Sequence, residues 1–192
     1  MNPLPRKKIL IAITGASGML YLDAFLAEMA GLDVEVHGIC SAAGRQVLDL
    51  EQGRAPESLP IVSRWFAEKD FAAPPSSGSS GYQAMVVLPC SMGSLAAIAQ
   101  GLSANLIHRS ADVMLKERKT LVLVVRETPF NRTHLTNMLA VHDAGGIICP
   151  PLPSLYFKPA TLAEAAQTFA WRLADQIGLD IPGRKRWGDG AC

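Results

Sequence analysis

Five short apolar segments, rich in valine and isoleucine, set the strongest limit on how this chain can fold. They span Ile9–Ile13, Val34–Cys40, Ala84–Leu88, Leu121–Val125 and Gly146–Cys149. Each is apolar almost throughout, whereas a strand with one face in water alternates apolar and polar residues. Continuous apolar strands are typical of parallel sheets that helices cover on both faces. The sequence therefore predicts a parallel sheet at the centre of the fold.

Most of these segments are separated by residues with helical spacing. Apolar side chains recur every three or four residues in Met19–Ala30, Leu135–His142 and Leu162–Ile177. The last of these helices has a predicted capping box, Thr161 with Glu164, at its start and Gly178 as a stop signal at its end. Alternating strands and helices predict an α/β fold, a Rossmann-like doubly wound parallel sheet.

The alternation extends over most of the chain, so we expect a single domain over residues 1–192, with tails at 1–7 and 183–192. Two segments interrupt it. Residues 52–82 end in "APPSSGSSG" and are predicted to form a long functional loop rather than a linker. Residues 150–159, "PPLPSLYFKP", are predicted to form a rigid aromatic connection before the last helix.

The chain is apolar for a soluble protein of its size. Hydrophobic residues make up 49% of the 192 residues and charged residues 18%. No apolar run reaches the roughly 18 residues needed to cross a membrane, and the basic start "MNPLPRKK" leads into a strand without a signal-peptide cleavage site. Since obligate interfaces resemble a core cut in half, we assign the apolar surplus to subunit contacts and expect a homo-oligomer that does not bind membranes.

Charge and cysteine content argue against several other classes of protein. The net charge is +1, from 18 basic and 17 acidic residues, without the basic stripe of nucleic-acid-binding proteins. The four cysteines, Cys40, Cys90, Cys149 and Cys192, show neither a CxxC pair nor the histidine spacing of zinc sites. We expect reduced thiols in a cytoplasmic protein and no bound metal.

Small and hydroxyl-bearing residues follow the first three strands. Ligands of open α/β sheets bind beyond the carboxyl ends of the strands, where this chain has "TGASG", "CSAAGRQ", "PCSMGS", "RETP" and "PPLPSLYF" in turn. The first three loops open into helices and can bring backbone N–H groups and serine hydroxyls to an anion. Basic residues stand nearby in the sequence: Arg45, Arg109, Lys116 and Arg126. The pattern favours a phosphorylated ligand.

The first loop, "ITGASG", is not the dinucleotide fingerprint G-x-G-x-x-G, because it has glycine only at Gly15 and Gly18. The second strand ends in Cys40 and Ser41, where a NAD-binding chain has an acidic residue for the ribose. These residues argue against NAD as the ligand.

Six motifs occur in order between about Lys8 and about Ile181: "ITGASG", "RQVLDLE", "SSGSSGYQAMVVLPCSMGSLAAIAQG", "RSADVMLKE", "LVLVVRETPF" and "PPLPSLYFKP". Together they resemble the flavin prenyltransferase family of the UbiX type, within the flavin-containing cysteine decarboxylase-like flavoprotein superfamily. The resemblance implies a homododecamer that binds FMN at subunit contacts. It also implies transfer of a dimethylallyl group from dimethylallyl monophosphate to N5 and C6 of reduced FMN. The product, prenylated FMN, would serve a UbiD-type decarboxylase.

The resemblance assigns site residues by matching position. The residues assigned to FMN are Gly15, Ala16, Ser17, Ser41, Ser91, Met92, Gly93, Ser94 and Arg109. The residues assigned to the prenyl phosphate are Lys116, Arg126, Glu127, Tyr156 and Arg172. Glu51 matches a carboxylate implicated in the chemistry, and Trp187 matches an aromatic residue near the family's C-terminus.

These residue types suit the ionisation of an allylic monophosphate. Lys116 and Arg172 offer positive charge to the leaving phosphate, and Glu127 is the candidate general acid, which burial beside the phosphate would keep protonated. The flavin ring is the aromatic face that stabilises the allylic cation. Ser17 is expected to relay the N5 proton and Glu51 to assist at C6.

Other interpretations of the same residues stay open at this point. Arg126 and Glu127 also suit a structural ion pair at a strand end, and Lys116 with Glu117 suits a solvated helix face. Where some relatives carry basic residues, this chain reads "SAAG" and "CSMGS". The alternative functions are an FMN-dependent cysteine decarboxylase-like enzyme and a non-catalytic FMN-binding accessory subunit of a decarboxylase.

Overall fold

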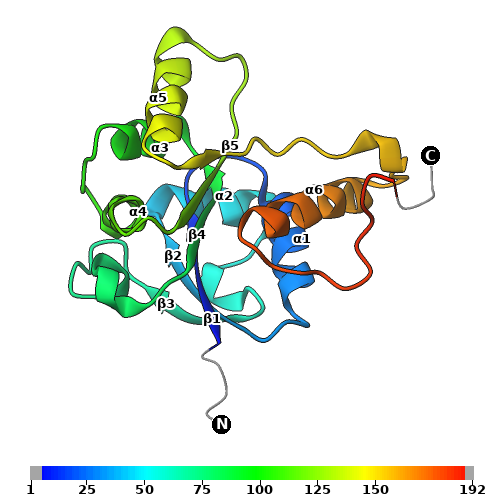
Figure 1. Ribbon diagram of the computed structural model, residues 1–192, viewed down its shortest axis with the longest axis horizontal. Coiled ribbons are helices and arrows are strands. Elements are labelled where there is room, and N and C mark those ends of the chain that lie inside the picture. Colours follow the sequence, from blue (N-terminus) through cyan, green and yellow to red (C-terminus); the bar gives the residue numbers. More distant parts are fainter. Residues whose placement is uncertain (1–5, 189–192) are drawn as a thin grey trace.

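Within residues 6–188, which the computed structural model describes, six parallel strands form one sheet (Figure 1). The strands are β1 (Lys7–Ile13), β2 (Val34–Cys40), β3 (Val62–Phe66), β4 (Ala84–Cys90), β5 (Thr120–Val125) and β6 (Ile147–Ile148). All neighbouring strands pair in parallel. Their order, β3-β2-β1-β4-β5-β6, is that of a Rossmann-like doubly wound sheet and confirms the predicted fold class.

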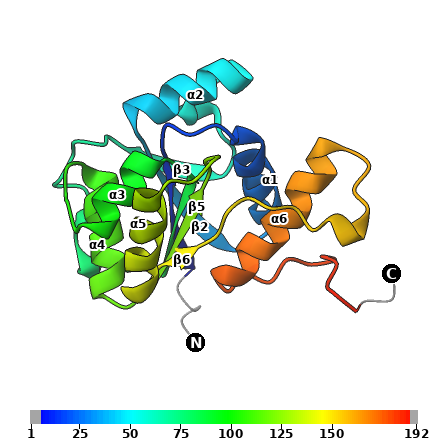
Figure 2. The same ribbon diagram turned by 90° about the horizontal axis from the view of Figure 1, so that it is seen from above.

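Helices cover both faces of this sheet. The α-helices of the described chain are α1 (Met19–Met29), α2 (Ala42–Gln52), α3 (Met92–Ala99), α4 (Leu106–Lys116), α5 (Arg132–Asp143) and α6 (Leu162–Gln176). The connections hold short 3-10 helices, η1 (Pro56–Ser58), η2 (Pro74–Ser76), η3 (Gly78–Ser80) and η4 (Leu155–Phe157). Figure 2 shows α1 and α6 on one face and α3, α4 and α5 on the other. No helix between residues 6 and 188 has the length and apolar character to cross a membrane.

Successive residues of β1 face opposite helical layers. Ile9, Ile11 and Ile13 belong to the core under α1 and α6, whereas Leu10 and Ala12 belong to the core under α3 and α4. All five side chains are at most 1% exposed. A strand buried on both faces has no position for a polar side chain, which explains the continuous apolar segments of the sequence.

The strand β3 lies inside residues 52–82, for which the sequence predicts a long loop; for Val62–Phe66 that prediction is wrong. This strand pairs with β2 and forms one edge of the sheet. Ser63 and Arg64 are exposed there, so the segment lacks the continuous apolar character by which the inner strands are recognised. Elsewhere in residues 52–82, Gln52 ends α2, and turns and irregular segments connect the short helices η1, η2 and η3.

The apolar stripe of α5 points away from the sheet. Leu135 and Leu139 are 54% and 59% exposed, whereas Asn137 and Val141 on the opposite side are buried. The helical spacing that usually marks the core side of a helix therefore leaves an uncovered apolar face in the single chain. Such a face suits a contact between subunits.

The start and stop signals of α6 operate as the sequence indicates, with one difference. The Thr161 hydroxyl accepts a hydrogen bond from the N–H of Glu164 at 3.1 Å. The Glu164 carboxylate accepts from the N–H of Ala160, not from that of Thr161, so half of the predicted capping box forms. After the helix, Gly178 has a φ of +65°, which glycine adopts without strain.

Both segments predicted as tails contain residues that are held by the fold. Lys7 begins β1, and its ammonium group donates to the carbonyl oxygens of Ile177 and Gly178. Near the other end, the side chain of Arg184 is 7% exposed. Cys192 lies outside the described residues.

Candidate functional site

Four of the predicted loops meet at the carboxyl edge of the sheet, where the strand order reverses between β1 and β4. Backbone hydrogen bonds of 3.0–3.2 Å join them: Ser41 N–H to Ile13 O, Thr14 N–H to Pro89 O, and Arg126 N–H to Cys90 O. The segments after β1, β2, β4 and β5 are therefore neighbours. This is the position at which doubly wound sheets bind ligands.

Thr14 connects the first and third loops through its side chain and is absent from the predicted site. Its hydroxyl is fully buried, donates to the carbonyl oxygen of Pro89 at 2.8 Å and accepts from the N–H of Ser91 at 2.8 Å. The sequence gives one signal for this role, a threonine directly after a buried strand. Its partners are 75 and 77 positions away, which no local pattern reveals.

Ser41 and Ser91 begin helices at this edge. Ser41 accepts a hydrogen bond from the N–H of Gly44 at 3.0 Å, and Ser91 accepts from the N–H of Ser94 at 3.3 Å. The Ser91 hydroxyl donates to the Ser94 hydroxyl at 3.2 Å. These contacts leave the O–H groups of Ser41 and Ser94 able to donate to a ligand. Two helix N-termini with serine donors form a suitable environment for a phosphate.

Glycine residues let α2 and the first loop touch. A Cβ atom on Gly15 would lie 2.5 Å from the Cβ of Ala43, and one on Gly44 would lie 2.6 Å from the carbonyl oxygen of Ile13. At the start of α3, by contrast, Gly93 faces open space, since a Cβ atom there would meet no described atom within 4 Å apart from its chain neighbours and the backbone of its own helix. Close packing on one side and free space on the other leave room for a flat ligand against the backbone.

Ser17, Glu51 and Arg126 converge where α2 ends and α1 begins. The Glu51 carboxylate accepts hydrogen bonds from the N–H groups of Gly18 at 3.1 Å and Met19 at 2.8 Å, and from the Ser17 hydroxyl. Burial alone would raise the pKa of Glu51. These hydrogen bonds and the positive charge of Arg126 outweigh burial, so the pKa lies below its ordinary value of 4.5. Glu51 is therefore ionised at neutral pH.

Glu68 is a second residue of this edge that the sequence pattern does not predict. It follows β3, and its carboxylate accepts from the N–H of Ala42, in the first turn of α2, at 3.0 Å. Its carbonyl oxygen accepts from the N–H of Leu106, which begins α4. Because β3 is not recognised in the sequence, nothing places Glu68 at this edge in advance.

Two further predicted residues lie near this edge with partners of their own. Arg109, in α4, donates from Nε to the carbonyl oxygen of Ser76 at 3.1 Å and pairs with Asp112 at 2.8 Å. Glu127 is exposed, and its carboxylate accepts from the N–H of Thr128 at 2.8 Å. The burial that a general acid at Glu127 requires is therefore not provided by one chain.

Lys116 lies at the opposite edge of the sheet. It ends α4 just before β5 begins at Thr120, and it forms an ion pair with Glu117. The Glu117 carboxylate packs on Gly78, where a Cβ atom would lie 2.1 Å from it. Within one chain, Lys116 thus belongs to the amino edge and does not meet Ser17.

Tyr156 and Arg172 share a third location, a pocket of about 360 Å³ that also has Trp187 in its wall. Figure 1 shows η4, which carries Tyr156, at the end of the fold away from the sheet. The residues predicted for the prenyl phosphate therefore occupy three separate places in a single chain.

Comparison with known proteins identifies the family. A profile of the family described as Flavoprotein matches residues 2–167. The flavin prenyltransferase UbiX of Methanothermobacter thermautotrophicus is 41% identical over 182 residues, covering 94% of this chain and 95% of that protein. This chain belongs to the flavin prenyltransferase family of the UbiX type.

Solved structures of similar chains agree with this assignment. AnUbiX, crystallised in complex with FMN and dimethylallyl pyrophosphate, superposes with a TM-score of 0.91 at 40% identity, covering 95% of this chain and 98% of that one. A dodecameric FMN-dependent UbiX-like decarboxylase from Escherichia coli O157:H7 gives a TM-score of 0.89 at 36% identity, covering 94% and 98%.

The three cysteines that lie within the described residues are poor nucleophiles. Cys40, Cys90 and Cys149 are free thiols. Burial raises the pKa of Cys40 and of Cys90 to about 12, so both stay protonated at neutral pH. In the part of the chain that the structure describes, no group of three or more His, Cys, Asp or Glu side chains could hold a metal ion.

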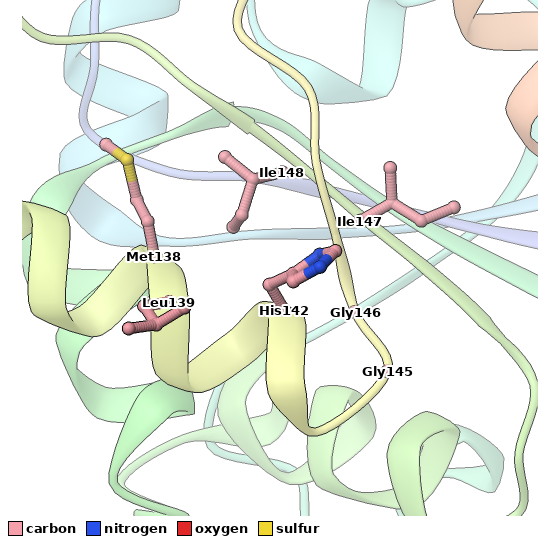
Figure 3. A pocket seen from close by; sticks show the side chains of 7 residues that line it. All are labelled: Met138, Leu139, His142, Gly145, Gly146, Ile147 and Ile148. Carbon is pink, nitrogen blue, oxygen red and sulfur yellow. The ribbon is translucent and has the colours of Figure 1, made fainter.

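A second pocket, of about 530 Å³, lies beside the outward face of α5. Figure 3 shows Met138, Leu139 and His142 of α5 on one side and Ile147 and Ile148 of β6 on the other. These are the side chains of the apolar stripe together with the last strand of the sheet. The pocket and the stripe form one continuous apolar surface, which we call the α5 face.

Proposed function

We propose that this protein joins a dimethylallyl group from dimethylallyl monophosphate to N5 and C6 of reduced FMN and releases orthophosphate. The observation that carries the proposal is the convergence of Ser17, Glu51 and Arg126 beside the serine-capped helix N-termini of the carboxyl edge. This arrangement offers donors for a phosphate and an ionised carboxylate for proton transfer at one place.

The residues at the carboxyl edge fit FMN. Its phosphate suits the N–H groups and hydroxyls of the loops that begin with Ser41 and Ser91. The open space at Gly93 and the tight first loop at Gly15 leave room for its ring. Ala16, Ser17, Met92, Ser94 and Arg109 complete the proposed FMN-binding set. When bound in its reduced form, FMN would supply the nucleophilic atoms N5 and C6.

Ser17 and Glu51 provide the route for a proton. Because the Ser17 hydroxyl donates to Glu51, a proton that its oxygen accepts from N5 can pass on to the carboxylate. Because the pKa of Glu51 lies below 4.5, its carboxylate is ionised at neutral pH and is free to accept a proton rather than donate one. The hydrogen bonds from Ser17, Met19 and Gly18, together with the positive charge of Arg126, keep this carboxylate ionised.

Activation of the prenyl donor requires more than one subunit. The C–O bond of the donor breaks, and the phosphate leaves with the electron pair. We assign the leaving phosphate to Lys116, Arg126, Tyr156 and Arg172, with Glu127 as its proton donor. Since one chain places these residues at three locations, a site that contains them all must lie between copies. We therefore propose a homo-oligomer, a dodecamer like the E. coli relative, with the α5 face among its contacts.

The chemistry of the product indicates which class of protein would use it, and the thiols indicate in which compartment. Prenylated FMN has no further use at this site, so we propose that it passes to a UbiD-type decarboxylase. We place this transfer in the cytoplasm, where the thiols of Cys40, Cys90 and Cys149 would stay reduced.

Release of orthophosphate tests the proposal. Under anaerobic conditions, reduced FMN and dimethylallyl monophosphate together should yield orthophosphate, and omission of either should abolish it. Glu127→Gln should slow the release by about 100-fold if Glu127 is the general acid. A cysteine decarboxylase would instead release carbon dioxide from a peptide with a C-terminal cysteine, and an accessory subunit would bind FMN without releasing phosphate. Either result would overturn the proposal.

A further inference from the structure

Residues that follow α6 form part of the wall of the pocket that contains Tyr156 and Arg172. Its walls come from η4, from α6 and from residues 185–187: Ser154, Tyr156, Phe157, Thr168, Trp171, Arg172, Asp175, Lys185, Arg186 and Trp187. Figures 1 and 2 both show the segment after α6 turning back toward η4. We call residues 181–188 the return segment.

Arg184 fixes the return segment to α6. Its guanidinium pairs with Asp175 at 2.5 Å and with Asp180 at 2.8 Å, and it donates to the carbonyl oxygen of Leu179 at 3.0 Å. The side chain of Arg184 is 7% exposed and that of Asp175 is 25% exposed, so this charge-assisted pair is largely shielded from water, whereas Asp180 is exposed. The anchor holds the next residue, Lys185, at the wall of the pocket.

The pocket contains more positive than negative charge. Asp175 is neutralised by Arg184, and Arg186 also lies 3.4 Å from it. Arg172 and Lys185 form no ion pair with any residue between 6 and 188. A phosphate monoester carries a charge of about −1.5 to −2 at neutral pH. Two positive side chains therefore match the charge of one monophosphate.

The remaining wall suits a short branched hydrocarbon. Trp187 meets the ring of Tyr156 edge-to-face, with 4.9 Å between centroids, and the ring of Phe157 meets Trp171 at 6.1 Å. The Tyr156 hydroxyl forms no hydrogen bond within the part of the chain that the structure describes. It is thus available to a phosphate oxygen at the boundary between the charged and the aromatic walls.

We propose that Lys185, which lines the same pocket as Arg172, is a further phosphate-binding residue for the prenyl donor, and that Arg184 positions it. The inference rests on the proposed function, because the function makes the ligand of this pocket an allylic monophosphate. It also gives the return segment a role in specificity. The positive charges of Lys185 and Arg172 together favour a monophosphate ester over the uncharged alcohol.

Calorimetric titration of the full-length protein with oxidised FMN bound tests this inference, since oxidised FMN does not consume the donor. Lys185→Ala should weaken the binding of dimethylallyl monophosphate by about 10-fold, as expected for the loss of one charged hydrogen bond. Lys185→Arg should bind within about 3-fold of the parent. Lys69→Ala, an exposed lysine outside the pocket, is the matched control and should bind as the parent does.

The positioning role of Arg184 is tested by combining variants. Arg184→Gln should weaken donor binding to a similar extent, and the double variant with Lys185→Ala should be little worse than either single variant. FMN affinity should not change in any of them. Unchanged donor affinity in Lys185→Ala, or a parent that does not bind the donor, overturns the inference. A parent that binds the donor but releases no orthophosphate with reduced FMN overturns the proposed function and leaves the phosphate site standing.

Discussion

The Glu51 carboxylate, at the end of α2, accepts a hydrogen bond of 2.8 Å from the N–H of Met19, the first residue of α1. Gly18, which precedes α1, has no side chain to cap the helix, so a carboxylate 32 positions away in the sequence performs this task. A negative charge at a helix N-terminus is stabilising. The same contact orients the carboxylate that we propose as the proton acceptor, so one residue serves both the fold and the chemistry.

Replacing Glu51 with alanine should therefore lower both stability and activity. The loss of a helix cap costs about 1 kcal/mol of unfolding free energy, and the loss of a proton acceptor should slow prenylated FMN formation by about 100-fold. Chemical denaturation and the anaerobic assay measure the two effects. Asp49→Ala, an exposed acid on the same helix, should change neither quantity.

The stability difference between the parent and Glu51→Ala should depend on pH. Since the pKa of Glu51 is lowered in the folded protein, its contribution is fully present above the ordinary value of 4.5 and is lost as the pH falls through the lower folded value. Denaturation curves at pH 7 and at successive values below 4.5 should show the two proteins converging. A difference that grows toward low pH would contradict the hydrogen-bonded, ionised carboxylate.

Thr14→Val should damage the carboxyl edge without changing the volume of the side chain much. It leaves the N–H of Ser91 and the carbonyl oxygen of Pro89 without the bonds that they make to the hydroxyl. We expect a loss of about 1 to 3 kcal/mol in unfolding free energy and weaker FMN binding. Thr14→Ser keeps the hydroxyl and should retain FMN affinity. Equal FMN affinity in Thr14→Val would show that the third loop holds its shape without this bridge.

Glycine-to-alanine substitutions should lower the unfolding free energy at a tightly packed position but not at an open one. Gly44→Ala forces a Cβ atom to within 2.6 Å of the Ile13 carbonyl oxygen and should cost about 1 to 3 kcal/mol. Gly93→Ala adds a Cβ in open space inside a helix and should leave the unfolding free energy unchanged or up to about 1 kcal/mol higher. Thermal or chemical denaturation of both variants provides the comparison. Similar losses in both would contradict the close approach of α2 to β1.

Leu139→Glu should disrupt assembly through the α5 face. The substitution places a charge on an apolar surface that is 59% exposed in the single chain, and burying an unpaired carboxylate in an interface is costly. Light scattering after size exclusion should show a smaller species than the parent. Thr136→Glu, an exposed polar position on the same helix, is the control and should keep the parent mass. An unchanged mass for Leu139→Glu would show that the α5 face is not a contact between subunits.

Much of the fold could be predicted because local patterns carry it. The inner strands are buried on both faces, so their apolar segments are continuous, and Val34–Cys40 has in the structure the bounds expected from the sequence. The edge strand β3 could not be predicted in this way, because Ser63 and Arg64 face water. The outward direction of the α5 stripe also escapes prediction, since periodicity shows that a helix has an apolar side but not what covers that side.

In the candidate site, too, local sequence patterns predict the position of some residues but not of others. Loops that follow strands are placed by the topology alone, which is why Ser41 and Ser91 both lie against the end of β1, bonded to Ile13 and Thr14. Thr14, Glu68 and the capping role of Glu51 depend on contacts between distant parts of the chain and have little local signature. Lys116 shows a further limit: its sequence neighbourhood suggests a phosphate ligand, but its position on the amino edge makes any such role depend on another subunit.

The mass of the flavin after reaction tests the central claim most directly. The protein is incubated anaerobically with reduced FMN and dimethylallyl monophosphate, and the flavin is then extracted and weighed by mass spectrometry. The proposed function predicts FMN that is heavier by one five-carbon unit derived from the dimethylallyl group. Flavin of unchanged mass, from a protein that binds both FMN and the donor, would contradict it.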